Sequence, residues 1–476
     1  MIKFLKHISY LILVFAACTH APSKKAKPIH KDIAKIQEEG KLKALINYSS
    51  TSYFLYKGVP MGFEYELLKK YAQHIGVELE VIPIKNMDSI FIDLNKGKAD
   101  VVAANLTITK ERLKEVNFTL PVIITKQVLV QRKPDGWHKM RKKDLEKSLL
   151  QSPLEMANKT IVVREGSSFY TRLKSLSNEI GEKINIEVVP GEITMEQLIE
   201  KVAHKEINYT VADRNIALVN QWHYPNIDAS VIISVDQKIA WATRTNSDSL
   251  TLSVNNWLND FQRTKMFKIL YNKYFNNKFL FTTRVKNKYY TLESGQISAY
   301  DEVIKKYAPE INWDWELLAA LIYQESHFNN SAIGWGGSFG LMQMMPQTGE
   351  RFGVDTTSSA EQNIHAGVRY IKKLNHIWSK SITDSLERIK FILASYNTGP
   401  GHVIDAKNLA EKYGKDPTNW KEVSYFLLHK SEPKYYKDEV VKHGYCKGYI
   451  AYDYVIEIME RYHHYKTIMN EKKEGS

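Results

Sequence analysis

Two kinds of hydrophobic pattern divide the chain into two blocks. Up to about residue 274, short runs of β-branched residues alternate with segments whose apolar residues recur every three to four positions. The runs predict strands at 42–47, 78–84, 101–104, 126–131, 160–163, 184–189, 209–212 and 239–244, and the helical spacing predicts helices at 64–75, 87–96 and 194–201. Such alternation predicts an α/β domain over residues 36–274 with mainly parallel sheets.

The second block is helical throughout. From residue 300 onward the strand pattern stops, and helical patterns are separated by loops that contain glycine and asparagine. We therefore expect an all-α domain over residues 300–470. An aromatic and basic stretch over residues 271–293 fits either a linker or the C-terminal end of the first domain, and we assign residues 275–299 to a linker.

The first residues have the pattern of an export signal. Two lysines precede an apolar run over residues 8–17, which is shorter than the about 20 residues that span a bilayer but suits a secretory signal. The run ends in Ala-Ala-Cys at Cys18 and resembles a bacterial lipobox, in which the cysteine becomes lipidated and N-terminal after cleavage. The alternative is an ordinary signal peptide that happens to contain a cysteine.

The lipobox interpretation sets the expected location. It makes residues 1–17 a signal peptide, Cys18 the lipidation site and residues 18–35 a lipidated tether rich in Lys, Pro, Ala and Ser. Thr19 after the cysteine resembles the outer-membrane sorting pattern of Gram-negative lipoproteins. We therefore expect a protein that is lipid-anchored in the cell outer membrane and faces the periplasm.

Composition and charge narrow the class of protein. Hydrophobic residues make up 43% and charged residues 25% of the 476 positions, which excludes collagen-like, wholly disordered and polytopic membrane proteins. The formal net charge of +13 favours anionic partners, but no nucleic-acid motif accompanies it, so no nucleic-acid partner is expected. With only two cysteines, Cys18 and Cys446, and no zinc-type spacing, we expect no metal and no cofactor.

Several strings in the first block resemble one family of binding proteins. They are Gly62-Phe63-Glu64-Tyr65-Glu66-Leu67-Leu68, residues 100–112, Asn117-Phe118-Thr119-Leu120-Pro121-Val122, Arg164-Glu165-Gly166-Ser167-Ser168 and Ala212-Asp213-Arg214. Together they resemble the periplasmic solute-binding proteins for polar amino acids (family 3), which are two-lobed and close about a hinge. The resemblance places the hinge near residues 124–130 and 235–243, and implies an amino acid or a muropeptide as the ligand.

The same resemblance implies a role for each candidate ligand residue. Arg112 would clamp a ligand carboxylate, Ser167 and Ser168 would assist through hydroxyls and a helix N-terminus, and Asp213 would receive the ligand ammonium. A guanidinium fork does fit a carboxylate, and a desolvated aspartate suits an ammonium. Alternatively, Arg112 pairs with an acid on its own helix and Asp213 caps the helix that follows it. At residues 103–105 the family often has serine or glycine where this chain has Ala-Ala-Asn.

One carboxylate in the second block has the placement of a general acid. Residues 311–325 predict a helix with Asn312 as N-cap, and Glu325 extends the apolar face that begins at Trp315. A carboxylate on a buried stripe at the negative end of a helix is disfavoured as an anion. Its raised pKa would suit a general acid near neutral pH. The structural alternative is a glutamate bonded to a nearby backbone amide.

The surrounding motifs resemble a family of murein-cleaving enzymes. They are Gln324-Glu325-Ser326-His327-Phe328-Asn329, a glycine-rich loop at 334–340, residues 341–348, residues 363–370 and residues 394–401. In this order they resemble the goose-type lysozyme-like lytic transglycosylase domain (glycoside hydrolase family 23) over about residues 300–465. The resemblance implies peptidoglycan as substrate, Glu325 as the catalytic acid/base, and substrate binding by Gln343, Met345, Tyr396 and Asn397.

Two features of these motifs leave alternatives open. A family serine nine positions after the glutamate is replaced by Gly334, so its hydroxyl contact is either missing or supplied by Ser331 or Ser338. Met342 and Met344 are interpreted as core filling, since methionine often fills irregular gaps.

The acid content of the loop bears on the mechanism. A glycosidase usually employs two carboxylates, yet no Asp or Glu stands between Glu325 and Glu350. A single-acid mechanism follows, and the resemblance implies cleavage of the MurNAc–GlcNAc β-1,4 bond with 1,6-anhydromuramyl products. The alternatives are a hydrolytic muramidase, which would release reducing ends, and a solute-binding protein with an inactive helical domain. The order of the two domains resembles membrane-bound lytic murein transglycosylases that carry both on one lipoprotein.

Overall fold

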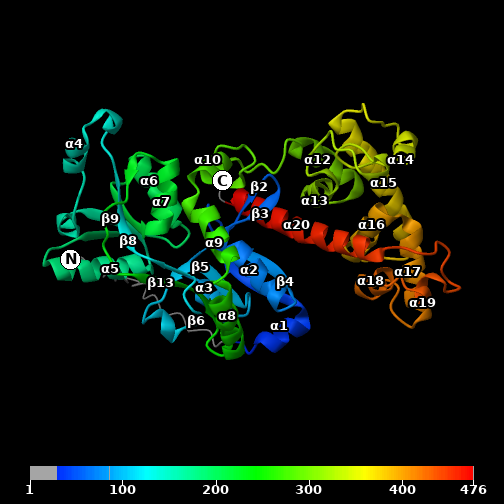
Figure 1. Ribbon diagram of the computed structural model, residues 1–476, viewed down its shortest axis with the longest axis horizontal. Coiled ribbons are helices and arrows are strands. Elements are labelled where there is room, and N and C mark those ends of the chain that lie inside the picture. The colour runs from blue at the N-terminus through cyan, green and yellow to red at the C-terminus, as the bar shows by residue number, and fades with distance from the viewer. Residues whose placement is uncertain (1–28, 85, 475–476) are drawn as a thin grey trace, which may run out of the picture.

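The computed structural model describes residues 29–84 and 86–474, so the expected signal peptide, Cys18 and most of the expected tether lie outside the described residues. Two α/β lobes lie side by side at one end of the molecule and a cluster of helices forms the other end (Figure 1). The long helix α20 (Gly448–Glu474) runs from the helical cluster back to the α/β part. The fold is thus multidomain, a two-lobed α/β domain followed by an all-α domain.

The first lobe is built on a six-stranded sheet. Its order is β4 (Glu78–Pro83), β1 (Lys41–Ile46), β5 (Val101–Thr107), β13 (Gln237–Thr243) and β6 (Asn117–Phe118), with β7 (Ile123–Thr125) also on β13. The helices of this lobe are α1 (Ile33–Glu39), α2 (Phe63–His74), α3 (Ile90–Asn95), α8 (Asp248–Phe261) and α9 (Lys265–Tyr271). α2 packs on β1 and β4, so its apolar residues fill one face of the sheet.

The second lobe has a five-stranded sheet of similar plan. Its order is β10 (Asn185–Val189), β9 (Thr160–Arg164), β11 (Tyr209–Asp213), β8 (Gln127–Arg132) and β12 (Ile227–Asp228). Its helices are α4 (Lys142–Lys147), α5 (Ser168–Ile180), α6 (Met195–Ala203) and α7 (Arg214–His223). α6 and α7 contact β11 and β8.

Both sheets are mixed rather than mainly parallel, which corrects the sequence prediction. β1 is parallel to β4 and β5, and β9 is parallel to β10 and β11, but β13 and β8 run antiparallel to their neighbours. The reason is that the chain crosses between the lobes twice, at Lys126 before β8 and at residues 233–236 before β13. A strand entered directly from the other lobe has no crossover helix to reverse its direction. The first crossing lies within the expected hinge segment 124–130, and the second overlaps the start of the expected segment 235–243.

The predicted helix at 87–96 is shorter in the structure. α3 begins at Ile90 because Met87–Ser89 form a turn, in which the side chain of Asn86 accepts a hydrogen bond from the backbone N–H of Asp88 at 2.7 Å. Such an Asx turn competes with helix formation at the same residues.

The segment between the two domains is helical and packed. It contains the π-helix Asn272–Asn276, α10 (Lys278–Val285) and α11 (Thr291–Ser294). α10 contacts α7, and α11 contacts β2 (Phe54–Tyr56), which pairs with β3 (Val59–Met61) in a hairpin. The buried hydroxyl of Thr291 bonds the backbone N–H and C=O of Leu55, both at 3.1 Å. Residues up to Ser294 therefore pack on the α/β domain.

The helical domain surrounds α13 (Trp315–Ser326). The other helices are α12 (Asp301–Tyr307), α14 (Pro346–Arg351), α15 (Ala360–Trp378), α16 (Ser385–Thr398), α17 (Pro400–Lys412), α18 (Trp420–Leu428), α19 (Pro433–Tyr436) and α20. α13 and α16 both contact α20, which therefore closes the core of this domain.

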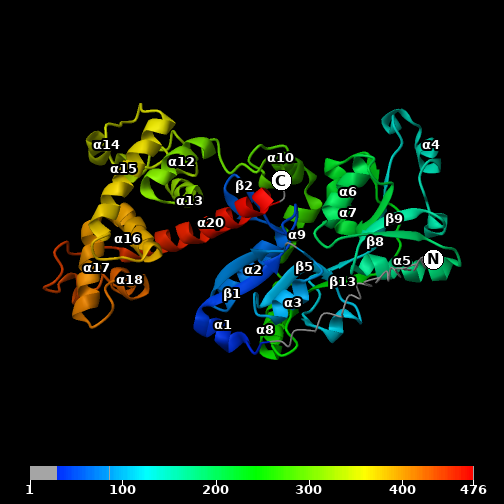
Figure 2. The same cartoon turned by 180° about the vertical axis from the view of Figure 1, so that it is seen from behind.

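The far half of α20 packs on the α/β domain, beside α2 and the β2–β3 hairpin (Figure 2). The Tyr465 hydroxyl donates to the Gly58 carbonyl at 2.8 Å, and the buried His464 lies 2.6 Å from the Tyr53 hydroxyl. Lys69 of α2 pairs with Glu460 at 2.9 Å. A single helix thus contacts both domains. Within residues 29–84 and 86–474, every helix is too short or too polar to cross a membrane.

Candidate active site and ligand cleft

The helix that carries Glu325 begins later than predicted. Residues Ala308–Ile311 form a 3-10 helix that ends at Asn312, which has a φ of +54° and therefore cannot be an N-cap; Asp314 is the N-cap residue of α13 instead. An asparagine tolerates the left-handed conformation, which is why it ends one helix here rather than starting the next. Leu317–Ile322 are all buried, so α13 is the central helix of its domain.

Glu325 lies in the last turn of α13 and its side chain is partly exposed. One carboxylate oxygen accepts a hydrogen bond from the Tyr454 hydroxyl of α20. Burial raises the pKa of Glu325 to about 7, and the bond from Tyr454 opposes that rise. The direction agrees with the sequence prediction, and it leaves a large protonated fraction at neutral pH.

Tyr454 is a residue of this site that the sequence analysis missed. It is 6% exposed, and burial followed by the Glu325 charge raises the pKa of its phenol well above the usual value. The phenol therefore stays a proton donor toward Glu325. A buried tyrosine usually has a hydrogen-bond partner, but sequence spacing does not reveal a partner 129 residues away.

Tyr396 connects the motif after Glu325 to the end of α16. Its hydroxyl donates to the Met342 carbonyl at 2.7 Å, and the charge of Glu325 adds to the burial that raises the pKa of Tyr396. The next residue, Asn397, is exposed. Met342 and Met344 are buried, as expected for core filling, whereas Met345 is 46% exposed.

Gln343 braces the glycine-rich loop. It has a φ of +44°, its amide nitrogen donates to the carbonyls of Ala332 at 3.0 Å and Gly340 at 2.8 Å, and its oxygen accepts from the Ser338 hydroxyl at 2.9 Å. Both amide N–H groups are thus used inside the loop. Only the oxygen has acceptor capacity left for the substrate contact that the family resemblance implies.

The structure explains why residue 334 is glycine in this chain. A Cβ at Gly334 would lie 2.4 Å from the side-chain oxygen of Gln343 and 2.4 Å from the Ser338 hydroxyl. Of the two serines considered as substitutes for the family hydroxyl, Ser338 is adjacent to Gly334 but bonds Gln343, and Ser331 is exposed.

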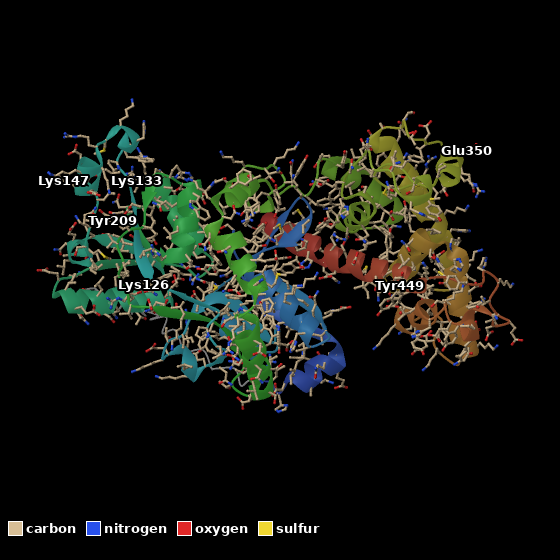
Figure 3. The ribbon with its side chains drawn as sticks, in the orientation of Figure 1. Lys126, Lys133, Lys147, Tyr209, Glu350 and Tyr449 are labelled. Carbon is tan, nitrogen blue, oxygen red and sulfur yellow. The ribbon has the colours of Figure 1, made fainter. Side chains whose placement is uncertain are left out.

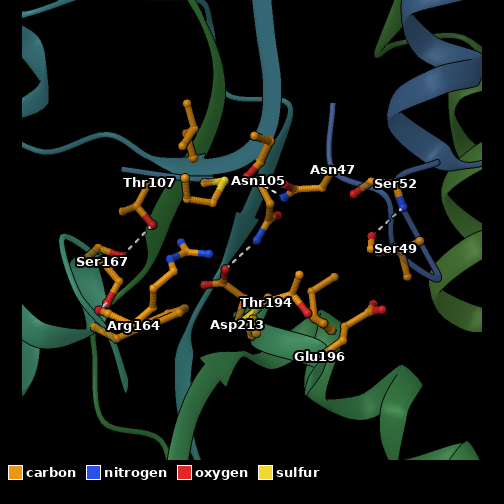
Figure 4. A pocket seen from close by; sticks show the side chains of 18 of the residues that line it. Asn47, Ser49, Ser52, Asn105, Thr107, Arg164, Ser167, Thr194, Glu196 and Asp213 are labelled. Atoms are coloured by element: carbon orange, nitrogen blue, oxygen red, sulfur yellow. Dashed lines mark hydrogen bonds between the residues drawn. The ribbon is translucent and has the colours of Figure 1, made fainter. Parts of the chain in front are cut away.

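A second candidate site lies between the two lobes of the α/β domain. The cleft is lined by Asn105, Thr107 and Arg112 of the first lobe and by Arg164, Ser167, Ser168, Glu196 and Asp213 of the second. The structure therefore brings all four predicted ligand residues, Arg112, Ser167, Ser168 and Asp213, to one place. Figure 4 shows a hydrogen bond between Asn105 and Asp213 that joins the lobes across this cleft.

Asp213 is the most strongly buried acid of the cleft. One carboxylate oxygen accepts from the Asn105 amide at 2.6 Å, and the other has no hydrogen-bond partner among the described residues. Burial raises the pKa of Asp213 to about 7, against the hydrogen bond from Asn105 and the charges of Arg112 and Arg164. Asp213 precedes α7 but makes no side-chain cap bond, so the capping alternative finds no support.

The cationic groups of the cleft are two arginines. Arg112 donates to the Thr107 carbonyl at 3.0 Å, and burial lowers its pKa to about 10. Arg164, which the sequence analysis did not single out as a ligand residue, has a buried Nε without a partner among the described residues. A buried, unpaired donor is costly, so these groups suit an anionic ligand atom.

The two predicted serines differ in what their hydroxyls do. The Ser167 hydroxyl caps α5 by accepting from the backbone N–H of Tyr170 at 3.3 Å, and donates to the Arg164 carbonyl at 2.7 Å. The Ser168 hydroxyl instead donates across the cleft to Thr107 at 3.1 Å. Ser168 therefore contacts the opposite lobe, whereas Ser167 orients the start of α5.

Further contacts hold the lobes together. Glu196 of the second lobe accepts from both the backbone N–H and the hydroxyl of Ser50, at 3.0 and 2.7 Å, and the Met87 N–H donates to the Gly191 carbonyl at 3.1 Å. The lobes are thus in a closed arrangement. Across residues 29–84 and 86–474, no group of His, Cys, Asp and Glu has the geometry to hold a metal ion.

Comparisons with known proteins match both parts of the chain. Residues 41–277 match the bacterial extracellular solute-binding proteins, family 3, and residues 302–419 match the transglycosylase SLT domain. A "membrane-bound lytic murein transglycosylase F" from Desulfosudis oleivorans is 35% identical over 440 residues, 92% of either chain. The protein of that name from Photobacterium profundum is 30% identical over 90% of this chain and 81% of its own.

Among solved structures, a mutant of ArgBP from T. maritima matches with a TM-score of 0.43 and 21% identity, over 52% of this chain and 99% of its own. An ancestral arginine-binding protein bound to arginine matches with a TM-score of 0.41 and 22% identity, over 50% of this chain and 98% of its own.

Proposed function

The chain belongs to the membrane-bound lytic murein transglycosylase F family, and from that premise we propose that Glu325 is its single catalytic acid and base. The protein is a peptidoglycan lytic transglycosylase with an N-terminal ligand-binding domain. The proposal adds the residues and the order of proton transfers to that activity.

The observation that supports it is the environment of Glu325. Its raised pKa is shaped by burial and by Tyr454 alone. In a retaining glycosidase the two carboxyl groups lie about 5.5 Å apart, and a second carboxylate at that distance would also perturb the pKa of Glu325. No acidic residue stands between Glu325 and Glu350, and Glu350 lies at the outer edge of the helical domain (Figure 3). These observations support a site in which one carboxyl group performs both proton transfers.

The chemistry follows in two steps. Protonated Glu325 donates its proton to the glycosidic oxygen as the bond from MurNAc C1 to that oxygen breaks, and the muramyl acetamide stabilises C1. The Glu325 carboxylate then takes the proton of the 6-hydroxyl while O6 bonds C1 and closes the 1,6-anhydro ring. Glu325 is returned to its acid form, and no water is consumed. Because this hydroxyl belongs to the same sugar, its high effective concentration favours it over water.

The protein positions these steps through two neighbours of Glu325, Tyr454 and Tyr396. Tyr454 holds one carboxylate oxygen, which aims the other at the substrate. Tyr396 fixes the Met342 carbonyl and thereby the loop that ends at the exposed Met345. We assign Met345, Tyr396 and Asn397 to substrate contact, and Gln343 to contact through its oxygen and to bracing the loop.

The first test is Glu325→Gln. The amide keeps the volume and the bond from Tyr454 but has no proton to donate, so murein cleavage should fall by about 10⁴-fold or more, since general acid–base catalysis alone contributes about 10²–10⁴. Glu350→Gln is the matched control, because Glu350 is exposed. Solubilised muropeptides from purified sacculi measure the rate. An active Glu325→Gln enzyme would show that the catalytic residue is assigned incorrectly.

The N-terminal cleft is assigned to a zwitterionic ligand, an amino acid or a muropeptide stem. Arg112 and Arg164 would bind its carboxylate, and the unpartnered oxygen of Asp213 its ammonium, with Ser167 and Ser168 beside them. A ligand at 100 times its dissociation constant should stabilise the protein by about 2.7 kcal/mol, visible as a rise in Tm.

Arg112→Ala should abolish that rise, while Lys110→Ala, an exposed neighbour, should not. A hit that binds Arg112→Ala equally well would contradict the assignment of the carboxylate position.

The location is the third part of the proposal. The lipobox pattern at Cys18 indicates a lipid anchor in the outer membrane, and stable anchoring requires more than one acyl chain. Cys18→Ala should leave the protein unprocessed or release it from outer-membrane fractions. Unchanged partitioning of a processed Cys18→Ala protein would contradict the anchor.

A further inference from the structure

One tryptophan of the helical domain is exposed in a way that the proposed proton transfers do not use. Trp335 is 96% exposed, whereas the other eight tryptophans of the chain are buried or half-buried. Within the described part of the chain, its side chain has no aromatic, cationic or hydrogen-bonding partner. Exposing a whole indole to water is unfavourable, so this position calls for an explanation.

The tryptophan stands at the tip of a turn with a fixed base. Ile333 and Phe339 form a bridge, the Gly334 N–H donates to the Ser338 carbonyl at 2.8 Å, and the Gly340 N–H donates to the Ala332 carbonyl at 3.0 Å. The two residues after Trp335 are glycines with φ of +70° and +79°, a conformation that other residues rarely adopt. The bracing by Gln343 adds to this, so the indole is presented in a defined place.

The tryptophan is continuous with the proposed substrate contacts. Ile333, 75% exposed, and Met345, 46% exposed, lie in the same loop. A Cβ on Gly336 would come within 3.1 Å of the terminal methyl of Met345, so the tip of the turn packs beside Met345. We call Ile333, Trp335 and Met345 the tryptophan patch. Tyr396 ties the same loop to the surroundings of Glu325.

The charge of the surrounding sequence distinguishes a membrane surface from a sugar as the binding partner of this patch. The chain carries a net +13, yet residues 326–349 contain no Lys, Arg, Asp or Glu. A membrane-binding patch gains its affinity from Lys and Arg next to the apolar residues. The exposed polar residues that precede the turn in sequence are instead His327, Asn329, Asn330 and Ser331, none of which is a lysine or an arginine. An aromatic face among neutral hydrogen-bonding groups matches a sugar ring, which has one C–H face and a rim of hydroxyls and amides.

We propose that the tryptophan patch is a glycan subsite, in which Trp335 stacks on an N-acetylhexosamine ring beyond the two sugars that flank the cleaved bond. The subsite rests on the proposed function and extends it, because it gives the enzyme a preference for longer glycan strands. Trp335 acts on binding and does not take part in proton transfer.

The test uses the full chain with Glu325→Gln, so that bound sugar is not cleaved, and titrates it with chitohexaose and chitobiose by calorimetry. Adding Trp335→Ala should weaken chitohexaose binding by about tenfold, while chitobiose changes little. Trp335→Phe should keep most of the affinity because a ring remains. Trp137→Ala, a half-buried tryptophan of the second lobe, is the matched control. In the active enzyme, Trp335→Ala should raise KM for murein and leave kcat nearly unchanged.

Three outcomes would overturn the subsite. The first is equal chitohexaose binding with Trp335 and with Trp335→Ala, and the second is a fall in kcat at constant KM in Trp335→Ala. The third is that Trp335→Ala weakens binding to vesicles of anionic phospholipid but does not weaken binding to chitohexaose. Because Trp335 is exposed, Trp335→Ala should leave Tm unchanged, so misfolding is recognised separately. A wild-type protein that cleaves no murein contradicts the proposed function itself, whereas normal cleavage by Trp335→Ala at unchanged KM contradicts only the subsite.

Discussion

Removing the Tyr454 hydroxyl should move the pH dependence of murein cleavage in a defined direction. In the structure this hydroxyl donates to Glu325 and lowers the pKa of its carboxyl, which burial raises to about 7. A hydrogen bond to a charged group is worth about 1.5–3 kcal/mol, and 1.36 kcal/mol corresponds to one pKa unit. Tyr454→Phe should therefore raise the pKa of Glu325 by about one to two units.

The sign of the effect follows from the proposed role of Glu325 as the acid of the first step. The first step needs the protonated carboxyl, so kcat/KM falls as pH rises through the pKa of Glu325 in the free enzyme. In Tyr454→Phe the carboxyl holds its proton to higher pH, and this alkaline limb should move up by the same one to two units, measured from about pH 5 to about pH 10 as anhydromuropeptide release from sacculi. The maximum kcat/KM at low pH should also be lower in Tyr454→Phe, because a weaker acid donates its proton less readily.

Tyr462→Phe is the matched control. Tyr462 lies on the same helix and also donates to a carboxylate, but that carboxylate belongs to Asp314 at the other end of α13. Its removal should leave the alkaline limb in place. An unchanged limb in Tyr454→Phe, or a limb that moves to lower pH, would refute the reasoning that burial and Tyr454 together set the pKa of Glu325.

Two further substitutions test the loop and the α/β core. Gly334→Ser should place its Cβ against Gln343 and Ser338, lower the free energy of unfolding by about 1–3 kcal/mol and reduce murein cleavage. Adding Ser338→Gly to this variant should restore part of the cleavage, and equal activity of Gly334→Ser and wild type would contradict the crowding. Burial raises the pKa of Glu64 from 4.5 to about 7, so its contribution to stability is full below pH 4.5 and is lost as pH rises through 7. In the wild type the free energy of unfolding should fall by up to about 3 kcal/mol over this pH range. Glu64→Gln should not show this fall, because its side chain does not titrate while its amide oxygen can still accept from Trp241. A wild-type Tm that falls no more steeply with pH than that of Glu64→Gln would contradict this.

The helix that carries Glu325 shows how far sequence patterns reach. Apolar spacing placed Glu325 at the end of a helix and predicted its raised pKa, because both depend on local periodicity and burial. The start of the helix was misplaced by four residues, since Asn312 adopts a left-handed conformation that ends the preceding 3-10 helix. Tyr454 was missed because its contact with Glu325 joins residues 129 positions apart.

The ligand cleft shows the same division. The motifs led to Arg112, Ser167, Ser168 and Asp213, which the structure brings together. The hydrogen bond from Asn105 to Asp213 forms only when the two lobes close, and it joins residues that are 108 positions apart in the sequence. Arg164 and Glu196 line the cleft for the same reason: each stands at the end of an element that reaches the cleft only in three dimensions. Residue spacing along a chain predicts which face of a helix or strand is buried, whereas the contacts in the cleft form between helices and strands that are distant in the sequence.

The chemistry of the product ends tests the single-acid mechanism most directly. Sacculi digested by the wild-type enzyme are reduced with borohydride and analysed by mass spectrometry. A 1,6-anhydromuramyl end has no reducing carbon. We therefore predict products that gain no hydrogen, because in the proposed single-acid mechanism the 6-hydroxyl and not water attacks C1. Muropeptides that take up borohydride hydrogen would identify a hydrolase with an activated water, and would contradict the mechanism.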